Sequence, residues 1–373
     1  MNSIEIFSGA GGLAKGLQMA GAEHRAFVEW NPCACNTLRM NFDAKKVYEV
    51  DVRDFQFSQY DNIDVIAGGP PCQPFSLGGK AQGNNDLRDM FPAAVAAIRD
   101  IAPKAFIFEN VKGLLRKSFE NYFEYIILQL KYPDIPLASA DWRENLCALR
   151  NLAFRNSVEP AYDVTYQLVN AADYGVPQIR ERVIIVGIRR NLKAAWSFPV
   201  PTHSRDALYW SMFVTGDYWR RYNIENYYSK DYVDGIADSL LKKYGFFPPE
   251  ALPWKTVRDA VSDLGEPDNV GDHMLRKGAK EYPGHTGSSM DEPSKTIKAG
   301  AHGVPGGENM IRYPDGHVRY YSVAEAKRIQ TFPDDYIITG SWTESMRQLG
   351  NAVPVTLAKT IGSSVIAALK PKS

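Results

Sequence analysis

The first 110 residues alternate short apolar runs, rich in β-branched residues, with stretches of helical character. The predicted strands are Ile4–Phe7, Arg25–Trp30, Lys46–Tyr48, Ile63–Ala67 and Ala105–Glu109. Strands that alternate with helices form a parallel sheet, because consecutive parallel strands need a crossover helix between them. The sequence therefore predicts an α/β fold, with a Rossmann-like sheet that carries helices on both faces.

The pattern changes after the fifth strand. Residues 116–160 look helical and amphipathic, and two further strands are predicted at Tyr166–Val169 and Arg182–Gly187. No helix is predicted between these two strands, so an antiparallel addition to the sheet is favoured.

The region from 191 to 318 has a different character. It is rich in Tyr, Trp, Gly, Pro and His and has weak periodicity, while helical patterns return at Ser322 and close with a helix at Val355–Leu369. We predict a large domain at 1–190, rejoined by 345–373, and a smaller, irregular, mostly β domain at 191–344.

Composition limits the class of protein. The chain has 43 basic and 43 acidic residues, which argues against a non-specific nucleic-acid binder but allows one positive surface on an enzyme. No run reaches the roughly 18 apolar residues of a membrane helix, and the N-terminus lacks a secretion pattern. We expect an intracellular protein with free thiols and no metal site, because its four cysteines include no CxxC pair.

A glycine-rich turn follows the first predicted strand. Phe7-Ser8-Gly9-Ala10-Gly11-Gly12 lies between a strand and a helix, where glycines let the backbone approach a ligand. Glu29 and Asp51 end the next two strands, where acids can bind ribose hydroxyls. A turn made only for packing is the alternative. The glycine spacing is not GxGxxG, which favours S-adenosylmethionine over a dinucleotide.

A second unusual loop follows the fourth strand. In Gly68-Gly69-Pro70-Pro71-Cys72-Gln73-Pro74, glycines and prolines surround a single cysteine on the same predicted rim as the turn. A buried structural thiol is the alternative reading of Cys72. The loop composition favours a reactive residue instead.

Charged residues end the neighbouring strands. Glu109 closes the fifth strand and could hydrogen-bond or protonate a base edge, or act only as a helix cap or salt-bridge partner. Alternation places Gln178, Arg180 and Arg182 on one face, where the two guanidinium groups could hold a phosphate, orient Glu109 or favour a thiolate. A solvated charged strand end is the simpler possibility.

Together these segments resemble the DNA (cytosine-5)-methyltransferase family. The family motifs are matched in order at Phe7–Gly12, Pro71–Gln73, Glu109–Val111, Gln178–Arg182, Arg319–Gln330 and Gln348–Pro354. The resemblance covers most of the chain outside 191–290 and implies a restriction-modification type of bacterial enzyme. Two features depart from the pattern: Glu5 stands where aspartate is common, and the stretch between Asn110 and Tyr174 is longer than a minimal member needs.

The resemblance implies a binding site for S-adenosylmethionine, with S-adenosylhomocysteine as the product. Phe7 and Trp30 would pack on the adenine ring, Glu29 would bind the ribose, and Asp51 would meet the adenine amino group. The expected cofactor residues are Phe7, Gly9, Gly11, Gly12, Leu13, Glu29, Trp30, Asp51, Val52, Gly69, Pro71, Asn351 and Val353.

The same resemblance assigns residues 191–344 to target recognition in double-stranded DNA. The glycine-rich stretch that follows Cys72 is expected to close over a flipped cytosine. The expected nucleic-acid contacts are Gln73, Ser76, Gly78, Arg88, Gln178 and Thr296. A monomer in the bacterial cytoplasm, associated with the nucleoid, is implied, with a cognate restriction endonuclease acting on the same site.

In the implied reaction, Cys72 adds to cytosine carbon-6, Glu109 binds or protonates ring N3, and Arg180 and Arg182 hold both groups in place. Three alternatives remain open at this point. They are the same chemistry on RNA, a catalytically inactive DNA-binding relative, and a cysteine hydrolase. The hydrolase is disfavoured because all six histidines lie outside the motifs.

Overall fold

The computed structural model describes residues 1–71, 89–139, 141–155, 157–268, 270–299 and 309–370. The chain divides into two compact units. Unit 1 comprises Met1–Val169, Glu181–Pro199 and Ala358–Ser373, and unit 2 comprises Asn170–Arg180 and Val200–Leu357. This division places residues 170–180 and 345–357 in unit 2, whereas the sequence assigned both stretches to the first domain.

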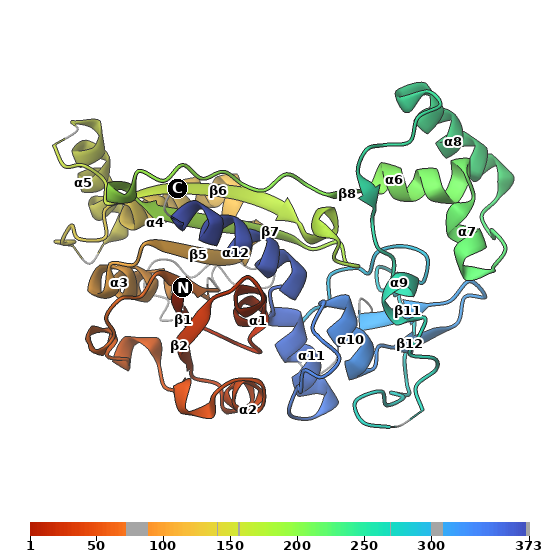
Figure 1. Ribbon diagram of the computed structural model, residues 1–373, viewed down its shortest axis with the longest axis horizontal. Coiled ribbons are helices and arrows are strands. Elements are labelled where there is room, and N and C mark those ends of the chain that lie inside the picture. Colours follow the sequence, from red (N-terminus) through yellow and green to blue (C-terminus); the bar gives the residue numbers. More distant parts are fainter. Residues whose placement is uncertain (72–88, 140, 156, 269, 300–308, 371–373) are drawn as a thin grey trace. The chain divides into compact units, whose positions relative to one another are not determined.

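Unit 1 is built on a seven-stranded sheet with the order β3-β2-β1-β4-β5-β7-β6 (Figure 1). Its strands are β1 (Asn2–Ile6), β2 (Glu23–Glu29), β3 (Val47–Glu49), β4 (Val65–Gly68), β5 (Ala105–Val111), β6 (Tyr162–Asn170) and β7 (Glu181–Arg189). Strands β1 to β5 pair in parallel, while β7 runs antiparallel to β5. The predicted α/β fold and the antiparallel addition are confirmed.

Helices connect and cover these strands. They are α1 (Gly12–Met19), α2 (Pro32–Asn41), α3 (Phe91–Ile101), α4 (Glu120–Lys131), α5 (Trp142–Phe154) and α12 (Val355–Leu369). The strand order reverses after β1, so right-handed crossovers place α1 and α2 on one face and α3 on the other. Helix α12 packs on α1, since a Cβ built on Gly362 would lie 2.6 Å from Cδ2 of Leu17.

The core of unit 1 lies between the sheet and its helices. Ile4, Ile66 and Phe106 are fully buried within it. Gly187 of β7 faces the Phe106 ring, and a Cβ there would lie 2.1 Å from the ring Cζ. Only glycine fits at this position, which explains a glycine inside an otherwise apolar strand.

Unit 2 has irregular segments joined by short elements. Its remaining strands are β8 (His203–Ser204), β9 (Leu252–Pro253), β10 (Ser288–Ser289), β11 (Met310–Arg312) and β12 (Val318–Tyr320). Its remaining helices are α6 (Arg205–Tyr209), α7 (Asp217–Tyr222), α8 (Lys230–Tyr244), α9 (Val257–Val261), α10 (Val323–Ile329) and α11 (Trp342–Asn351).

The expectation of a mostly β second domain is therefore corrected for the described residues, because helices provide more of the regular structure than these short strands. The longest helix of this region, α8, packs one face on an aromatic cluster that includes Phe213 and Trp219. Its apolar residues Val233, Ile236 and Leu240 have helical spacing. The many polar residues between them hide that pattern in the sequence.

One stretch, Trp342–Leu369, is long and apolar enough by composition to cross a membrane. In the structure it consists of α11 and α12, and α11 ends at Asn351 before α12 begins at Val355. Of its most apolar window, 56% is buried inside the protein. These features are those of core helices.

Candidate functional site

The register of the sheet brings four strand ends to one rim of unit 1. Ile6 of β1 pairs with Val28 of β2 and with Gly68 of β4, and Gly68 pairs with Phe108 of β5. The next residues along these strands are Phe7, Glu29, Gly69 and Glu109. Because parallel strands end on the same edge, the predicted cofactor turn and the predicted chemical residues lie together.

The turn after β1 has the backbone geometry of a binding loop. Gly9 and Gly11 have φ angles of 52° and 77°, and Phe7 has a φ of 54°, which bulky residues rarely adopt. The Ser8 hydroxyl donates to the carbonyl oxygen of Glu5 at 2.9 Å. Such strain is maintained by surrounding contacts and is common at functional sites.

Helix α1 begins directly after this turn. Gly12 is its first residue and Leu13 is buried, and no acidic side chain occupies its first turn. The first amides of a helix favour an anionic group. Beneath the turn, burial raises the pKa of Glu5 well above its usual value, although a hydrogen bond with the Ala14 backbone opposes this shift.

Glu29 holds the turn from the neighbouring strand. Its Oε2 accepts from the amide of Gly9 at 2.8 Å, and its Oε1 accepts from the amides of Trp30 and Asn31 at 3.0 and 2.8 Å. The side chain is buried, and Oε2 can accept one more donor. The sequence indicated a ligand-binding acid here, and the structure adds that Glu29 fixes the loop itself.

Two other predicted cofactor residues flank Glu29. Trp30 is 75% exposed at the end of β2. Asp51 lies 2.6 Å from Nη2 of Arg53, and the hydrogen bond from Arg53 lowers the pKa of the Asp51 carboxyl. Val52, which follows Asp51, is buried. An adenine amino group at Asp51 would therefore share that carboxylate with Arg53.

Glu109 and Arg182 form a close ion pair on the rim. Nε of Arg182 lies 2.6 Å from Oε1 of Glu109, and the side chains are only 13% and 11% exposed. In the β5–β7 register, Glu109 pairs with Ile184 and Val111 pairs with Arg182, so the ion-paired residues are diagonal neighbours on one face. The pair places a carboxylate and a guanidinium side by side at the end of β5.

Gly69 lies beside this pair. A Cβ at Gly69 would lie 3.4 Å from Oε2 of Glu109, at van der Waals contact with the carboxylate. Asn110, the next residue after Glu109, donates from Nδ2 to the carbonyl oxygen of Pro70 at 2.9 Å. The two motifs that flank the rim are thus bonded to each other.

The carbonyl oxygen of Pro71 accepts from the amide of Met90 at 3.1 Å. This hydrogen bond joins the two ends of the segment between residues 71 and 90. The predicted nucleophile and four predicted nucleic-acid contacts lie outside the described residues: Cys72, Gln73, Ser76, Gly78 and Arg88.

Arg180 has contacts that differ from the prediction. It is 1% exposed, and it donates from Nη1 to the carbonyl oxygen of Ile297 at 3.2 Å and from Nη2 to that of Gly350 at 2.8 Å. A buried guanidinium needs several acceptors, and backbone carbonyls of unit 2 supply them. Arg180 is therefore assigned a positioning role within unit 2, while Arg182 contacts the carboxylate.

Gln178, predicted to contact nucleic acid, is fully buried. Its Oε1 accepts from the amide of Ile297 at 3.1 Å, and its Nε2 donates to Oε1 of Gln330 at 3.2 Å. Both ends of the amide are satisfied inside unit 2, which leaves this side chain to organise protein segments.

Thr296 lies next to these contacts. Its hydroxyl donates to the carbonyl oxygen of Ile179 at 2.8 Å. Gly350 meets the same segment, since a Cβ there would lie 2.4 Å from the amide nitrogen of Ala299.

Of the two predicted cofactor residues that follow Gly350, Asn351 is exposed and Val353 is buried, and both belong to unit 2. Their assignment to the cofactor stays a prediction.

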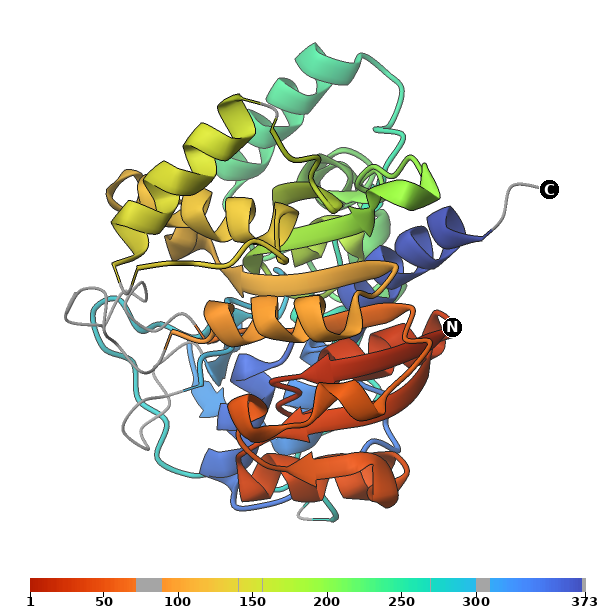
Figure 2. The ribbon, with the colours of Figure 1, turned by 90° about the vertical axis from the view of Figure 1, so that its left-hand side faces the viewer.

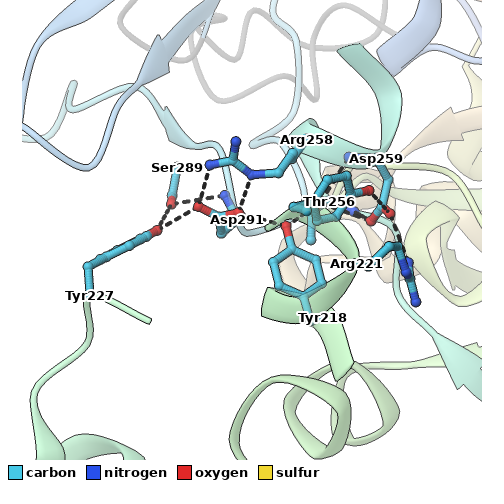
Figure 3. Close-up of polar contacts among 9 residues, drawn as sticks. Tyr218, Arg221, Tyr227, Thr256, Arg258, Asp259, Ser289 and Asp291 are labelled. Carbon is cyan, nitrogen blue, oxygen red and sulfur yellow. Dashed lines mark hydrogen bonds and ion pairs between the residues drawn. The ribbon is translucent and has the colours of Figure 1, made fainter. Parts of the chain in front are cut away.

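Sequence reasoning missed a buried polar network in unit 2 (Figure 3). Asp291 is 0% exposed. Its Oδ1 accepts from the hydroxyl of Tyr218 at 2.7 Å and from Nε of Arg258 at 2.6 Å, and its Oδ2 accepts from the hydroxyl of Tyr227 at 2.9 Å and from Nη2 of Arg258 at 3.0 Å. The Asp291 carboxylate thus bonds to side chains of α7 and α9. Asp291 itself lies in the turn after β10, five positions before Thr296.

The network extends to the start of α9. The Thr256 hydroxyl accepts from the amide of Asp259, and Asp259 accepts from the amide of Thr256 at 2.8 Å, which is a capping box. This box was readable in the sequence as a Thr and an acid three residues apart. The pairing of Arg258 with Asp291 was not, because the two residues lie 33 positions apart in aperiodic sequence.

The fold and the rim define an α/β enzyme with a nucleoside-type cofactor loop next to an acid–guanidinium pair. The chain matches the family model of the C-5 cytosine-specific DNA methylases over residues 1–133 and 153–367. It therefore belongs to the C-5 cytosine-specific DNA methylase family and is an enzyme of that class.

Individual relatives support this membership. The chain is 31% identical to the Type II methyltransferase M.NgoMIV of Neisseria gonorrhoeae over 371 residues, which covers 100% of this chain and 99% of the relative. It is 32% identical to the Type II methyltransferase M.Eco47II of Escherichia coli, over 97% of this chain and 78% of the relative.

Solved structures support the fold. The Dnmt2 methyltransferase of S. pombe aligns with a TM-score of 0.58 and 15% identity, covering 100% of both chains. The methyltransferase EhMeth of Entamoeba histolytica aligns with a TM-score of 0.57 and 16% identity, covering 100% of this chain and 99% of that one.

Proposed function

We propose that this chain transfers a methyl group from S-adenosylmethionine to carbon-5 of a flipped-out cytosine in a specific double-stranded DNA sequence, through a transient bond from Cys72. The observation that most supports this is the ion pair of Glu109 with Arg182 on the rim that also bears the glycine turn. A carboxyl group oriented by a guanidinium suits recognition of a pyrimidine edge. The proposal goes beyond family membership because it names the covalent route and the extruded base.

The described residues fit S-adenosylmethionine. Trp30 offers an exposed aromatic face, and Oε2 of Glu29 has room for one ribose hydroxyl donor. Among the described residues, nothing lies within 4 Å of the position that a Cβ of Gly9 would take, so this part of the chain leaves space for a ligand. When bound, this cofactor would supply an electrophilic methyl group.

Cytosine carbon-5 is a weak nucleophile, so the ring must be activated. In the proposed route a proton taken from solvent is held between the Glu109 carboxylate and ring N3 when cytosine binds. As the Cys72 thiolate forms a bond to carbon-6, this proton moves onto N3, and the electron pair of the former carbon-5–carbon-6 double bond makes carbon-5 nucleophilic. After carbon-5 has taken the methyl group, N3 returns its proton to Glu109. A base then removes the carbon-5 proton, the ring double bond re-forms and the thiolate leaves. Arg182 keeps Glu109 oriented throughout.

A cytosine in a duplex hides carbon-6, so it must leave the stack at a cost of a few kcal/mol. The curated relatives named above are Type II methyltransferases. By this likeness we propose a restriction-modification role on double-stranded DNA, as a monomer in the bacterial cytoplasm, with a cognate endonuclease that acts on the same site. Methylation of RNA and a catalytically inactive relative are the two alternatives that the test below separates.

The test is covalent trapping. Wild-type protein is incubated with S-adenosylmethionine and duplex DNA in which candidate cytosines are replaced by 5-fluorocytosine, and adducts that survive denaturation are counted. A fluorine at carbon-5 cannot be removed as a proton, so the bond to Cys72 should persist. Cys72→Ala should form no adduct yet retain DNA binding. Methyl transfer by Cys72→Ala would overturn the covalent route.

Two parallel measurements separate the alternatives. Bisulfite sequencing of DNA from cells that express the protein should reveal one methylated sequence. RNA should take up no labelled methyl group in the same assay. Uptake into RNA alone would favour the first alternative, and cofactor-independent DNA binding without any transfer would favour the second.

A further inference from the structure

One segment of unit 1 lies outside the match to the family model. Residues 134–152 lie in the gap between the two matched ranges. They contain the first eleven residues of α5, which packs against α4, with α3 beside α4 on the same side of unit 1 (Figure 2). The helix starts in a defined way, because the Asp141 side chain accepts from the amide of Arg143.

Trp142, the first residue of α5, packs on α4. Its ring meets that of Tyr122 edge-on, with centroids 5.2 Å apart and planes at 88°, and that of Tyr125 at 5.8 Å. Both tyrosines are buried. Edge-to-face pairs of this kind favour one ring orientation beyond the burial of area. Trp142, which lies in the unmatched segment, therefore fixes the orientation of the Tyr122 ring.

The Tyr122 hydroxyl donates to Oδ2 of Asp89. The other carboxylate oxygen of Asp89, Oδ1, accepts from the amide of Phe91 at 3.3 Å, in the first turn of α3. The next residue, Met90, donates its amide to the carbonyl oxygen of Pro71 at 3.1 Å. Asp89 therefore lies next to the hydrogen bond between Met90 and Pro71. Cys72 directly follows Pro71 in the sequence.

We propose that Tyr122, supported by Trp142, is a positioning residue for methyl transfer, because it holds Asp89 and through it the closed junction of Met90 with Pro71. This inference rests on the proposed function, since it concerns the placement of Cys72. Neither Tyr122 nor Trp142 touches substrate in this account. Their effect is on the geometry of the chain ends that flank the nucleophile, and displacements of about 1 Å at a reacting group can cost about a hundredfold in rate.

The test is a double-mutant cycle on full-length protein. Tyr122→Phe removes the hydroxyl but keeps the ring against Trp142. Asp89→Asn leaves Oδ1 for the Phe91 amide and replaces the acceptor of the Tyr122 hydroxyl with an amide nitrogen. Each should lower the single-turnover methylation rate by about tenfold, and the double variant should lose no more than either alone.

Tyr125→Phe is the matched control. It removes a buried hydroxyl from the same helix and against the same Trp142 ring, but this hydroxyl accepts from Nε2 of Gln129 at 3.1 Å. It should leave the single-turnover rate within about twofold of wild type. Trp142→Leu should reproduce the rate loss of Tyr122→Phe, whereas Phe154→Ser on the 88% exposed end of α5 should not.

Two further readouts separate positioning from general destabilisation. The rate of adduct formation with 5-fluorocytosine DNA should fall in Tyr122→Phe, while the Kd for S-adenosylmethionine and the melting temperature stay near wild type. Rates in Tyr122→Phe and Asp89→Asn that match wild type, or losses that multiply in the double variant, would overturn this inference. Failure of wild-type protein to form any adduct would instead refute the proposed function.

Discussion

Nε of Arg182 and Oε1 of Glu109 lie 2.6 Å apart on neighbouring antiparallel strands, with almost no solvent around them. In this low-dielectric setting each charge depends on the other, because an unpaired buried charge is costly. The pair therefore serves two purposes that mutation can separate. The guanidinium of Arg182 keeps the Glu109 carboxyl group on the rim in one orientation. The carboxylate of Glu109 in turn balances the positive charge of that guanidinium.

The first prediction concerns Glu109→Gln. Glutamine has the same shape but is a very weak proton donor and carries no charge, so kcat should fall by about 10²–10⁴-fold. The Kd for S-adenosylmethionine should change little, because Glu109 makes no contact with the glycine turn among the bonds described above. Methylation kinetics and calorimetric titration measure the two quantities. An unchanged kcat would exclude Glu109 from the chemistry.

The second prediction concerns Glu29→Gln. Glu29 accepts three backbone amides, and the glutamine amide nitrogen cannot accept from Gly9. Each buried donor left unsatisfied costs about 1–3 kcal/mol. We expect weaker cofactor binding and lower thermal stability together, measured by titration and by melting. Loss of affinity without any loss of stability would show that Glu29 contacts the ligand alone and does not fix the loop.

The third prediction concerns Asp291→Asn in unit 2. It leaves the guanidinium of Arg258 without its buried charge partner, so the free energy of unfolding should fall by about 3–5 kcal/mol. Asp217→Asn is the control, because its ion pair with Arg220 has side chains 59% and 69% exposed, and solvent screening leaves such a pair little effect on stability. Urea unfolding of both variants provides the comparison, and equal losses would contradict the network's importance.

The fourth prediction concerns pH. Burial lowers the pKa of His24 to about 4, a shift opposed by its hydrogen bond with the Ala14 backbone. The unfolded chain binds a proton near pH 6.5 while the folded chain does not, so stability is lost as pH falls from about 6.5 towards 4. Between pH 7 and pH 5 this costs roughly 2 kcal/mol.

The measurement compares wild type with His24→Gln at both pH values, and the pH-dependent loss should be smaller in the variant by that amount. Wild type and variant must be compared because Glu292 also affects how stability depends on pH, and its effect has the opposite sign to that of His24. Burial raises the pKa of Glu292 to about 7, so its contribution weakens as pH rises. An identical pH dependence in both proteins would show that His24 does not remain neutral in the fold.

Much of unit 1 was predictable because its strands are short, apolar and separated by helices. The rim followed from the same pattern, since parallel strands end together, and Phe7, Glu29 and Glu109 do lie at one level of the sheet. An antiparallel addition was predictable because no crossover helix separates β6 from β7, and β7 does run antiparallel to β5. These inferences needed only local sequence and sheet topology.

The contacts of individual polar side chains were not predictable in the same way. Alternation predicted Arg180 and Arg182 on one face, but it could not show that Arg180 precedes β7 and is buried against carbonyl groups of Ile297 and Gly350. Those partners are more than 100 residues away in sequence. The helix α8 was missed for a related reason, because its helical pattern rests on three apolar residues among many polar ones.

The antiparallel direction of β7 has a consequence for how this enzyme can change in evolution. The strand enters the sheet at the rim, so Arg182 is its second residue and Arg180 lies just before it, in the other unit. One residue inserted or deleted within β7, directly after Arg182, would turn Arg182 to the opposite face of the sheet, because the pairing of residues 183–188 with β5 fixes the rest of the strand. The segment between β5 and β6 can change in length without altering this register, whereas β7 must keep its length.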